Sequence, residues 1–202
     1  MTIRAVILDF GGVLLRTEDR SPREQLAARL GLPKEKLYYQ IFESESARQA
    51  MVGKISAEAH WEAVRLALGI SEDVFKEARE AFWAGDRLDQ ELIDTLRGLQ
   101  PRYKTALLSN AWDDLRTVIQ RNWNFSDAFD EMIISAEVGI AKPDARIYRI
   151  ALDRLEVLPD EAVFVDDFIE NIESARTFGL KTIHFQDSQR LYTDLAMILD
   201  GR

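Results

Sequence analysis

Three carboxylates in this 202-residue chain stand where short apolar runs end. Asp9 directly follows the run 5–8, and Asp166 and Asp167 directly follow the run 163–165. Apolar runs of this length are typical of the buried strands of a parallel sheet. Open α/β sheets place their reactive groups at the carboxyl ends of such strands. These carboxylates are therefore candidates for a nucleophile and for ligands of a metal ion.

Each of these carboxylates also has a plain structural role open to it. Asp9 stands close before Gly11 and Gly12 and could simply form a turn, and one member of the Asp166-Asp167 pair could cap a helix. However, two adjacent carboxylates repel each other, and both stay ionised far more easily beside a cation. Mg²⁺ prefers oxygen ligands and keeps several waters, so a sparse carboxylate site suits it. The pair therefore favours a Mg²⁺ site.

A hydroxyl and an amide follow a third apolar run. Ser109 and Asn110 stand directly after residues 106–108, and a helical pattern begins a few residues later. The simplest role for Ser109 is to cap that helix. In the alternative, the two side chains donate hydrogen bonds to the oxygens of an anion that lies near the helix N-terminus. The sequence leaves both roles open.

Lys142 is the remaining candidate, and its neighbour sets it apart. Most lysines are solvated surface groups, but Pro143 is expected at the first position of a helix, where it directs the chain locally. A lysine held at such a point could neutralise a carboxylate nucleophile and a bound phosphate together. Lys142 is therefore predicted to belong to the same site as the carboxylates.

The elements that would position these groups alternate along the chain. Strand-like runs occupy residues 5–8, 105–108, 132–134, 162–165 and 181–185, and helical patterns occupy residues 88–99, 113–121, 145–155, 169–178 and 189–199. Alternation of this kind predicts a parallel sheet with helices on both faces. We therefore expect an α/β fold with a doubly wound, Rossmann-like core.

Residues 17–87 interrupt this alternation. They show helical patterns only, with Ser56 and Ser71 as expected N-caps and Gly69 as an expected C-terminal cap. Helices inserted after the first strand would form a separate, all-helical lobe. The predicted division is a catalytic core of residues 1–16 and 88–202 and a helical cap of residues 17–87.

Several residues near these motifs have competing roles. Trp112 follows the hydroxyl–amide pair closely, and it is expected either at an interface between the lobes or at the entrance of the site. Asp113 and Asp114 are expected as acidic residues in the first turn of the next helix. His60 is expected as a packed or surface residue rather than a ligand.

Composition narrows the classes of partner. The formal net charge of −9 argues against nucleic acid and against an anionic membrane surface, because both attract basic patches. The absence of cysteine excludes disulfides, thiol catalysis and thiolate metal ligands. No signal-peptide pattern is visible, and no apolar run approaches the about 18 residues needed to span a bilayer. We expect a cytoplasmic protein with a small-molecule partner. The sequence leaves open whether the protein forms a homodimer.

Four motifs of the chain, taken in sequence order, resemble those of the haloacid dehalogenase superfamily: Asp9, Ser109, Lys142 and the pair Asp166-Asp167. The resemblance covers the whole chain and includes an all-helical cap just after the first motif. The sequences Asp-Phe-Gly-Gly-Val, Leu-Ser-Asn and Val-Asp-Asp look most like the branch that holds the sugar-1-phosphate phosphatases. They are also similar to the phosphatase-like N-terminal domain of soluble epoxide hydrolases.

The resemblance implies roles for these residues. Asp9 would be the nucleophile that forms an aspartyl-phosphate, with Ser109 and Lys142 completing the catalytic set. The substrate phosphate would be bound at Gly11, Ser109, Asn110 and Lys142. A carboxylate and a phosphate dianion repel each other, so cationic groups must neutralise them before attack. Mg²⁺ would be held, directly or through water, by Asp9, the backbone carbonyl of Gly11, Asp166 and Asp167.

The chain departs from this family at Gly11, where most of its phosphatases carry a second Asp. That Asp protonates the leaving alcohol and later activates water, and such help is typically worth about 10²–10⁴-fold in rate. The metal ligand at this position is a backbone carbonyl, so a metal site is compatible with glycine. The departure therefore bears on proton transfer and not on metal binding.

Three functions follow from this pattern. The leading prediction is a Mg²⁺-dependent phosphatase of a small phosphorylated metabolite, with a sugar phosphate as one candidate. Haloacid dehalogenases also lack the second Asp and displace halide without a metal, but they would not be expected to keep Asp166 and Asp167. In the third alternative the protein binds a phosphate ligand without catalysis, and Gly11 records a lost activity.

Overall fold

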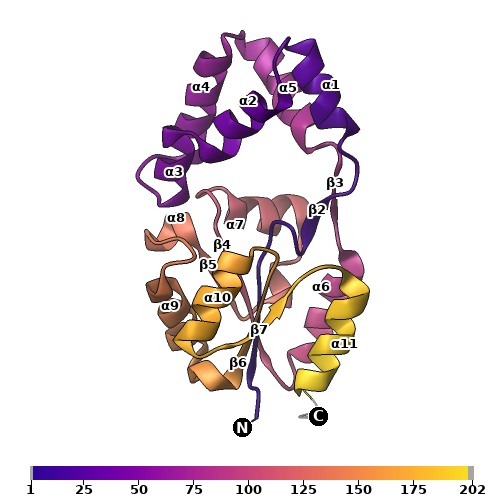
Figure 1. Cartoon of the computed structure of the whole chain (residues 1–202), viewed down its shortest axis with the longest axis vertical. Coiled ribbons are helices and arrows are strands. Elements are labelled where there is room, and N and C mark those ends of the chain that lie inside the picture. The colour runs from indigo at the N-terminus through magenta and orange to yellow at the C-terminus, as the bar shows by residue number, and fades with distance from the viewer. Residues whose placement is uncertain (1, 200–202) are drawn as a thin grey trace.

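The computed structural model describes residues 2–199 and contains a five-stranded parallel sheet (Figure 1). Across the sheet the strands follow the order β5-β4-β1-β6-β7. The strands are β1 Ala5–Leu8, β4 Lys104–Ser109, β5 Glu131–Ile134, β6 Ala162–Asp166 and β7 Lys181–His184. Each lies where the sequence predicts it, to within a residue at either end.

Helices cover both faces of this sheet, as the α/β pattern predicts. Val6 and Leu8 belong to a core cluster on one face, and Ala5 and Ile7 belong to a second cluster on the other, because successive side chains of a strand alternate. The first cluster packs against α6 Gln90–Leu99, α7 Leu115–Val118 and α11 Ser188–Leu199, and the second against α9 Ala145–Leu155 and α10 Ile169–Phe178. The fold is therefore doubly wound.

The strand order also fixes where a site can form. The chain leaves β1 for β4 and β5 on one side, and later returns to β6 and β7 on the other side. In open α/β sheets the crevice beyond the strand ends at such a reversal is the usual ligand site. The N-terminus lies at the far end of the molecule from the helical lobe, so β1 runs toward that lobe and ends beneath it (Figure 1).

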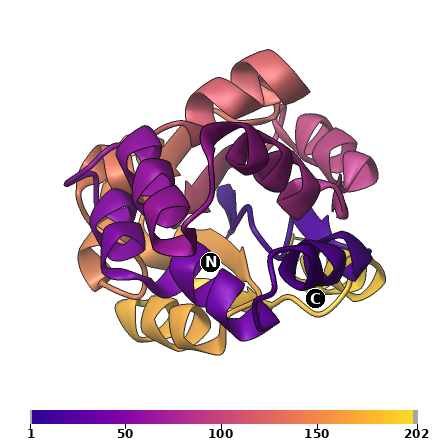
Figure 2. The ribbon, with the colours of Figure 1, turned by 90° about the horizontal axis from the view of Figure 1, so that it is seen from above.

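Helices between the first strand and the rest of the sheet gather into a lobe at one end of the molecule (Figure 1). Viewed from that end, they lie above the core (Figure 2). Leu26, Leu37, Trp61 and Phe82 are among the buried side chains of a separate apolar cluster within this lobe. The lobe contains α1 Ser21–Arg29, α2 Lys34–Tyr38, a π-helical turn Tyr39–Glu43, α3 Glu45–Met51, α4 Ala57–Leu68 and α5 Glu72–Trp83.

Two short strands connect this lobe to the core, and the sequence did not predict them. β2 Leu15–Thr17 and β3 Asp86–Leu88 pair antiparallel, with Leu15 opposite Leu88. The expectation that residues 17–87 contain helices only is therefore wrong at both ends. Three residues are too few to show a period-2 pattern, and their pairing joins segments that lie far apart in the chain.

Helix ends differ from the sequence predictions at four points. The helix expected at residues 88–99 begins at Gln90, because Leu88 belongs to β3. The Ser56 side chain accepts the Ala59 N–H as expected of an N-cap, whereas the Ser71 side chain makes no such bond to α5. Pro143 is not the first residue of a helix, because α9 begins at Ala145 and Asp144 is its N-cap. The helix expected at residues 113–121 consists of α7 and a π-helical turn over Ile119–Trp123. Within residues 2–199, no helix is both long and apolar enough to cross a membrane.

Candidate active site

The carboxyl ends of β1 and β6 bring the three predicted carboxylates together. Leu8 and Val165 are neighbours in the sheet, and the N–H of Asp9 continues the ladder by donating to the carbonyl of Val165 at 2.9 Å. One carboxylate oxygen each of Asp9, Asp166 and Asp167 lies within 4.8 Å of the others. Asp9 and Asp166 are buried. Residues more than 150 positions apart in the sequence thus form one acidic cluster.

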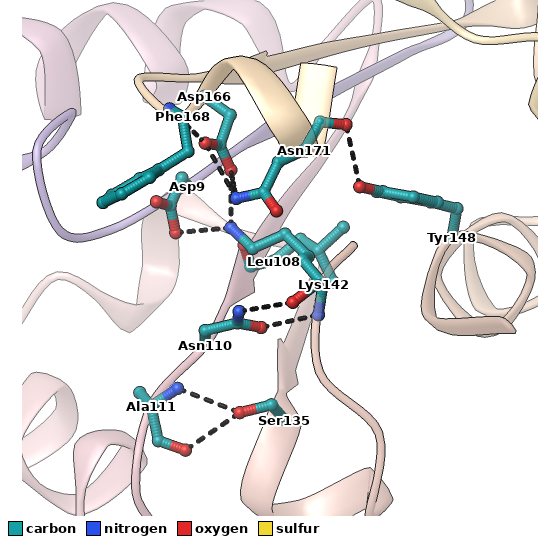
Figure 3. A network of polar contacts seen from close by, with 10 residues as sticks. All are labelled: Asp9, Leu108, Asn110, Ala111, Ser135, Lys142, Tyr148, Asp166, Phe168 and Asn171. Atoms are coloured by element: carbon teal, nitrogen blue, oxygen red, sulfur yellow. Dashed lines mark hydrogen bonds and ion pairs between the residues drawn. The ribbon is translucent and has the colours of Figure 1, made fainter. Parts of the chain in front are cut away.

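Lys142 lies inside this cluster, and its Nζ contacts three oxygen atoms there (Figure 3). Its Nζ is 2.8 Å from Oδ1 of Asp9 and 2.7 Å from Oδ2 of Asp166, and it donates to the carbonyl of Leu108 at 2.8 Å. The contacts with Leu108 and Asp166 are hydrogen bonds, and the contact with Asp9 is an ion pair. The side chain is 1 % exposed, which rules out the surface role that most lysines have.

The charges of the cluster perturb its carboxyl groups. Burial raises the pKa of Asp9 to about 6, the nearby Lys142 opposes that rise, and the like charge of Asp166 adds to it. Burial, followed by the charge of Asp166, also raises the pKa of Asp167. Both effects penalise the ionised forms, and a bound cation would remove the penalty.

Asp167 carries the feature that fits a metal ion most directly. Its Oδ1 is buried and has no hydrogen-bond partner among the described residues. A buried unpartnered carboxylate oxygen is costly unless a cation pairs with it. The main chain of Gly12, at a φ of +84°, passes so close that any Cβ there would collide with the Asp167 carboxylate. The carboxylates and the glycine thus fit a small, hard cation such as Mg²⁺.

Asp166 differs from Asp167 because its two oxygens are saturated by protein donors. Oδ1 accepts the N–H of Phe168 at 2.8 Å and the amide of Asn171 at 3.0 Å, and Oδ2 accepts Lys142. The hydroxyl of Tyr148 in turn donates to the carbonyl of Asn171 (Figure 3). The arrangement holds Asp166 and Lys142 in a fixed relation.

The side chains of Ser109 and Asn110 take different places in the site. Ser109 is the last residue of β4 and is buried at the same edge of the sheet as the carboxylates. The Asn110 side chain accepts the N–H of Lys142 at 2.8 Å and donates to the Lys142 carbonyl at 2.9 Å. This places Asn110 behind Lys142, so its predicted contact with substrate depends on the second N–H of its amide alone.

Gly11 has space around it, in contrast to Gly12. A Cβ added at Gly11 would have no heavy atom within 4 Å, whereas Gly12 admits no side chain. The absence of the second Asp is therefore not a steric requirement of the fold. The prediction that Gly11 contributes a metal ligand concerns its backbone carbonyl only and stays a prediction.

Ser135 is a buried polar residue that the sequence search missed. It follows directly after β5, and its hydroxyl lies 3.0 Å from the N–H of Ala111 and 2.7 Å from the carbonyl of Met51 in the lobe. An apolar run followed by a polar residue is the pattern that singled out Asp9, so the same rule applied to the run 132–134 would have found Ser135.

The loop after Ser109 reaches into the helical lobe. The centre of the Trp112 ring lies 4.7 Å from the centre of the buried His60 ring and 5.1 Å from the centre of the Trp61 ring. Of the two positions expected for Trp112, the lobe interface is therefore the observed one. The expectation that Asp113 and Asp114 lie in the first turn of a helix is wrong, because both precede α7, which begins at Leu115. Asp113 instead contacts the lobe. Its Oδ1 accepts the N–H of Ala57, the first residue of α4 in the lobe, at 2.8 Å.

The family of the chain follows from its match to a known profile. The profile of the haloacid dehalogenase-like hydrolases matches residues 3–179. The chain therefore belongs to this family of hydrolases, in agreement with its fold and with the order of its motifs.

Individual relatives share about a quarter of its residues. The bifunctional epoxide hydrolase 2 of Rattus norvegicus is 27% identical over 221 residues, which cover 98% of this chain but 39% of that protein. The chain thus spans about two fifths of the length of this relative. The D-ribitol-5-phosphate phosphatase of Bacteroides thetaiotaomicron is 26% identical over 208 residues, covering 98% of this chain and 100% of that protein.

Solved structures show the same fold. A haloacid dehalogenase family enzyme from Bacteroides thetaiotaomicron, crystallised in complex with magnesium and inorganic phosphate, superposes with a TM-score of 0.76. The superposition covers 94% of this chain and 99% of that one at 23% identity. At 23% identity, this structural similarity establishes the fold alone. The reaction has to be inferred from the residues of the site.

Proposed function

We propose that the chain is a Mg²⁺-dependent phosphatase that hydrolyses the phosphate monoester of a small metabolite through Asp9. The observation that carries this proposal is the contact of Lys142 with Asp9, inside a cluster of three carboxylates at the switch point of the sheet. The full-length alignment with a phosphatase supports the same class. In this proposal residues 1–16 and 88–202 form the catalytic core, and residues 17–87 form a cap that selects the substrate.

Asp9 attacks the phosphorus atom of the substrate. Its Oδ1 is held by Lys142 at 2.8 Å, which leaves Oδ2 to form the new bond. As that bond forms, the bond between phosphorus and the leaving oxygen breaks, and the alcohol departs. Water then attacks the aspartyl-phosphate, which releases phosphate and restores the carboxylate of Asp9. Ser109, at the end of the adjacent strand, would hold the transferring phosphoryl group.

The metal would be held by Asp9, Asp167 and the backbone carbonyl of Gly11, with Asp166 nearby. Asp167 is the stronger candidate for a direct ligand because its Oδ1 has no protein partner, whereas Asp166 is already saturated. When bound, Mg²⁺ would supply positive charge for the phosphate oxygens and the nucleophile. The Lys142 ammonium lies between Asp9 and Asp166 and supplies the remaining positive charge.

Glycine at position 11 restricts the substrates that this site can serve well. No carboxyl group stands there to protonate the departing oxygen, so that oxygen carries its own developing charge or takes a proton from water or substrate. A leaving group that is intrinsically acidic suffers least. Anomeric sugar phosphates, acyl phosphates and aryl phosphates are therefore favoured over phosphates of simple alkyl alcohols.

A screen of phosphorylated metabolites tests this function. Phosphate release is measured for each compound with Mg²⁺ and with excess chelator, using Asp9→Asn as a matched control for contaminating phosphatases. We expect release that requires both Mg²⁺ and Asp9. Halide release from 2-haloacids that continues in chelator would instead establish a dehalogenase, and phosphate binding without any turnover would establish a non-catalytic binding protein.

A further inference from the structure

We propose that Ser135 is a positioning residue that couples the docking of the helical lobe to the Lys142–Asp9 pair. This inference rests on the proposed function for the identity of the reacting groups. Ser135 is fully buried at the end of β5 and belongs to none of the four motifs. Its hydroxyl contacts the carbonyl of Met51 in the lobe on one side. On the other side it contacts Ala111 in the loop after β4 (Figure 3).

The lobe meets the core here through residues 51–57, which we call the docking segment. The carbonyl of Met51 accepts the Ser135 hydroxyl at 2.7 Å. Gly53, at a φ of +68°, lies so close to the carbonyl of Ala136 that any Cβ would collide with it. At the other end of the segment, the N–H of Ala57 donates to Asp113 at 2.8 Å. The docking segment is thus held by the loops that follow β4 and β5.

From Ser135 the contacts continue to the nucleophile. The Ser135 hydroxyl accepts the N–H of Ala111 at 3.0 Å, and Ala111 directly follows Asn110 in the chain. The Asn110 amide binds the main chain of Lys142 at both its N–H and its carbonyl. Lys142 then contacts Asp9. This is a contiguous physical network from the lobe to the reacting carboxylate, of the kind that can carry coupling.

The Ser135 hydroxyl has two alternative acceptors, and this makes it responsive to the lobe. Its single proton points either to the carbonyl of Met51 at 2.7 Å or to the carbonyl of Ala111 at 3.1 Å. The first bond exists only while the docking segment is in place. When the lobe moves away, the proton turns to Ala111 and the contacts of the β4 loop change. Lobe docking and the placement of Lys142 are therefore linked, and the linkage acts in both directions.

The amide of Ala57 offers a direct readout of docking. Its hydrogen bond crosses from the lobe to Asp113 in the core, so its exchange with deuterium slows when the lobe is docked. In the wild type we expect Mg²⁺ with inorganic phosphate to slow the exchange of this amide by about tenfold. In Ser135→Ala the same ligands should leave the exchange rate nearly unchanged, and kcat should fall by roughly tenfold with a much smaller change in KM.

Three further variants separate coupling from general damage. Ser135→Thr keeps the hydroxyl and should retain the ligand effect. Thr105→Val removes another fully buried hydroxyl, one that binds Ala128 at the opposite end of β4, and should behave as the wild type. Gly53→Ala should abolish the ligand effect with Ser135 intact, because its Cβ displaces the docking segment. It also provides the test if Ser135→Ala fails to fold.

Three results would overturn the inference. The first is an Ala57 amide in the wild type that does not respond to Mg²⁺ and phosphate. The second is a response that survives in Ser135→Ala, or in Gly53→Ala if that variant alone folds. The third is loss of the response in both Ser135 variants with Thr105→Val normal, which would assign the effect to packing and reject a hydroxyl relay. If the response depends on Ser135 but no substrate is turned over, the coupling stands and the proposed function fails.

Discussion

The charges of four residues define what the site can bind. Asp9, Asp166 and Asp167 carry three negative charges when ionised, and Lys142 carries one positive charge. The net charge of these four side chains is then −2, which one divalent cation would neutralise. Without that cation, burial and mutual repulsion raise the pKa of Asp9 and of Asp167. The same cluster that prepares the site for metal therefore destabilises the metal-free protein.

Asp9→Asn tests the nucleophile. The amide keeps the shape of the side chain but cannot form the phosphoryl ester, so kcat should fall by at least about 10³-fold. Phosphate release on the best substrate of the screen measures the loss, and circular dichroism checks that the fold is retained. Asp153→Asn, at an exposed position on α9, serves as the control with normal activity. A variant that keeps most of its activity would remove Asp9 from the nucleophile role.

The same substitution should change stability in a pH-dependent way. Burial raises the pKa of Asp9 to about 6, against 3.8 for an ordinary carboxyl. The Asp9 carboxyl therefore contributes to the stability of the folded state when it is protonated. This contribution is fully present below the unfolded-state pKa of 3.8 and is lost as the pH rises through about 6. In chelator at pH 7.5, Asp9→Asn should be more stable than the wild type by roughly 1–3 kcal/mol. Thermal unfolding at pH 5 should show a smaller difference, and a larger difference there would refute the assignment.

Asp167→Asn tests the metal site. The substitution removes the charge from the buried oxygen that has no protein partner, so the affinity for Mg²⁺ should fall. We expect the Mg²⁺ concentration for half-maximal activity to rise by at least about tenfold, a typical loss on disturbing a metal site. A Mg²⁺ titration of phosphate release measures it, again with Asp153→Asn as the control. An unchanged titration, or activity that persists in chelator, would exclude Asp167 as a ligand.

Gly11→Asp tests the missing acid. The position accepts a side chain, since a Cβ there meets no atom within 4 Å. In the wild type, kcat should be higher on a sugar-1-phosphate than on the matching sugar-6-phosphate, because the anomeric oxygen leaves more easily without a proton donor. Gly11→Asp should narrow that gap if the new carboxyl reaches the leaving oxygen. Gly11→Asn, which has the same shape but no acid, is the control.

The comparison of kcat values is informative only where the chemical step is rate-limiting. Single-turnover measurements establish this for each substrate. Equal wild-type kcat on the matched pair, under that condition, would show that another group supplies the proton.

At the scale of elements, one buried ion pair joins the first helix of the lobe to the β2–β3 connection. Arg23 in α1 donates two hydrogen bonds to the Asp86 carboxylate of β3, each at 2.8 Å, and a third to the carbonyl of Phe82 at 2.9 Å. The guanidinium also lies 4.3 Å from the centre of the Phe82 ring. Both charged side chains are below one tenth exposed. The pair therefore ties the first helix of the lobe to the strand that leads back to the core.

Arg23→Met should destabilise the protein by about 3–5 kcal/mol, because it leaves the Asp86 charge buried without a partner. For a chain of this size that corresponds to a fall in Tm of roughly 6–20 °C. Arg48→Met is the matched control, since the Arg48–Glu45 pair is exposed and such pairs contribute about 0–1 kcal/mol. The double variant Arg23→Met/Asp86→Leu should recover much of the loss in thermal unfolding. A small effect of Arg23→Met alone would show that Asp86 is solvated in solution.

At the scale of the whole molecule, the lobe is attached to the core at two separate places. One is the β2–β3 pair, and the other is the docking segment, which contacts the loops after β4 and β5 (Figure 1). Movement about the β2–β3 pair requires release of the docking segment. The site lies between these attachments, at the end of the sheet that faces the lobe. In the proposed function and coupling, access of substrate and placement of Lys142 therefore depend on the same contacts.

The sequence alone determined the α/β alternation, the five strands of the parallel sheet and the four polar motifs. It could do so because burial leaves a local record: an apolar run ends at the residue where the strand leaves the core, and Asp9, Ser109 and Asp166 mark those ends. The predictions for α9 and α10 agree with the structure at both ends for the same reason.

Only the tertiary structure decided which residues contact each other. The pairing of β2 with β3, the placement of Asn110 behind Lys142 and the contact of Asp113 with Ala57 join segments that are distant in the chain. No local periodicity encodes such partners, since a side chain's pattern records whether it is buried but not what it meets. The partners depend on how the sheet order and the lobe bring distant loops together.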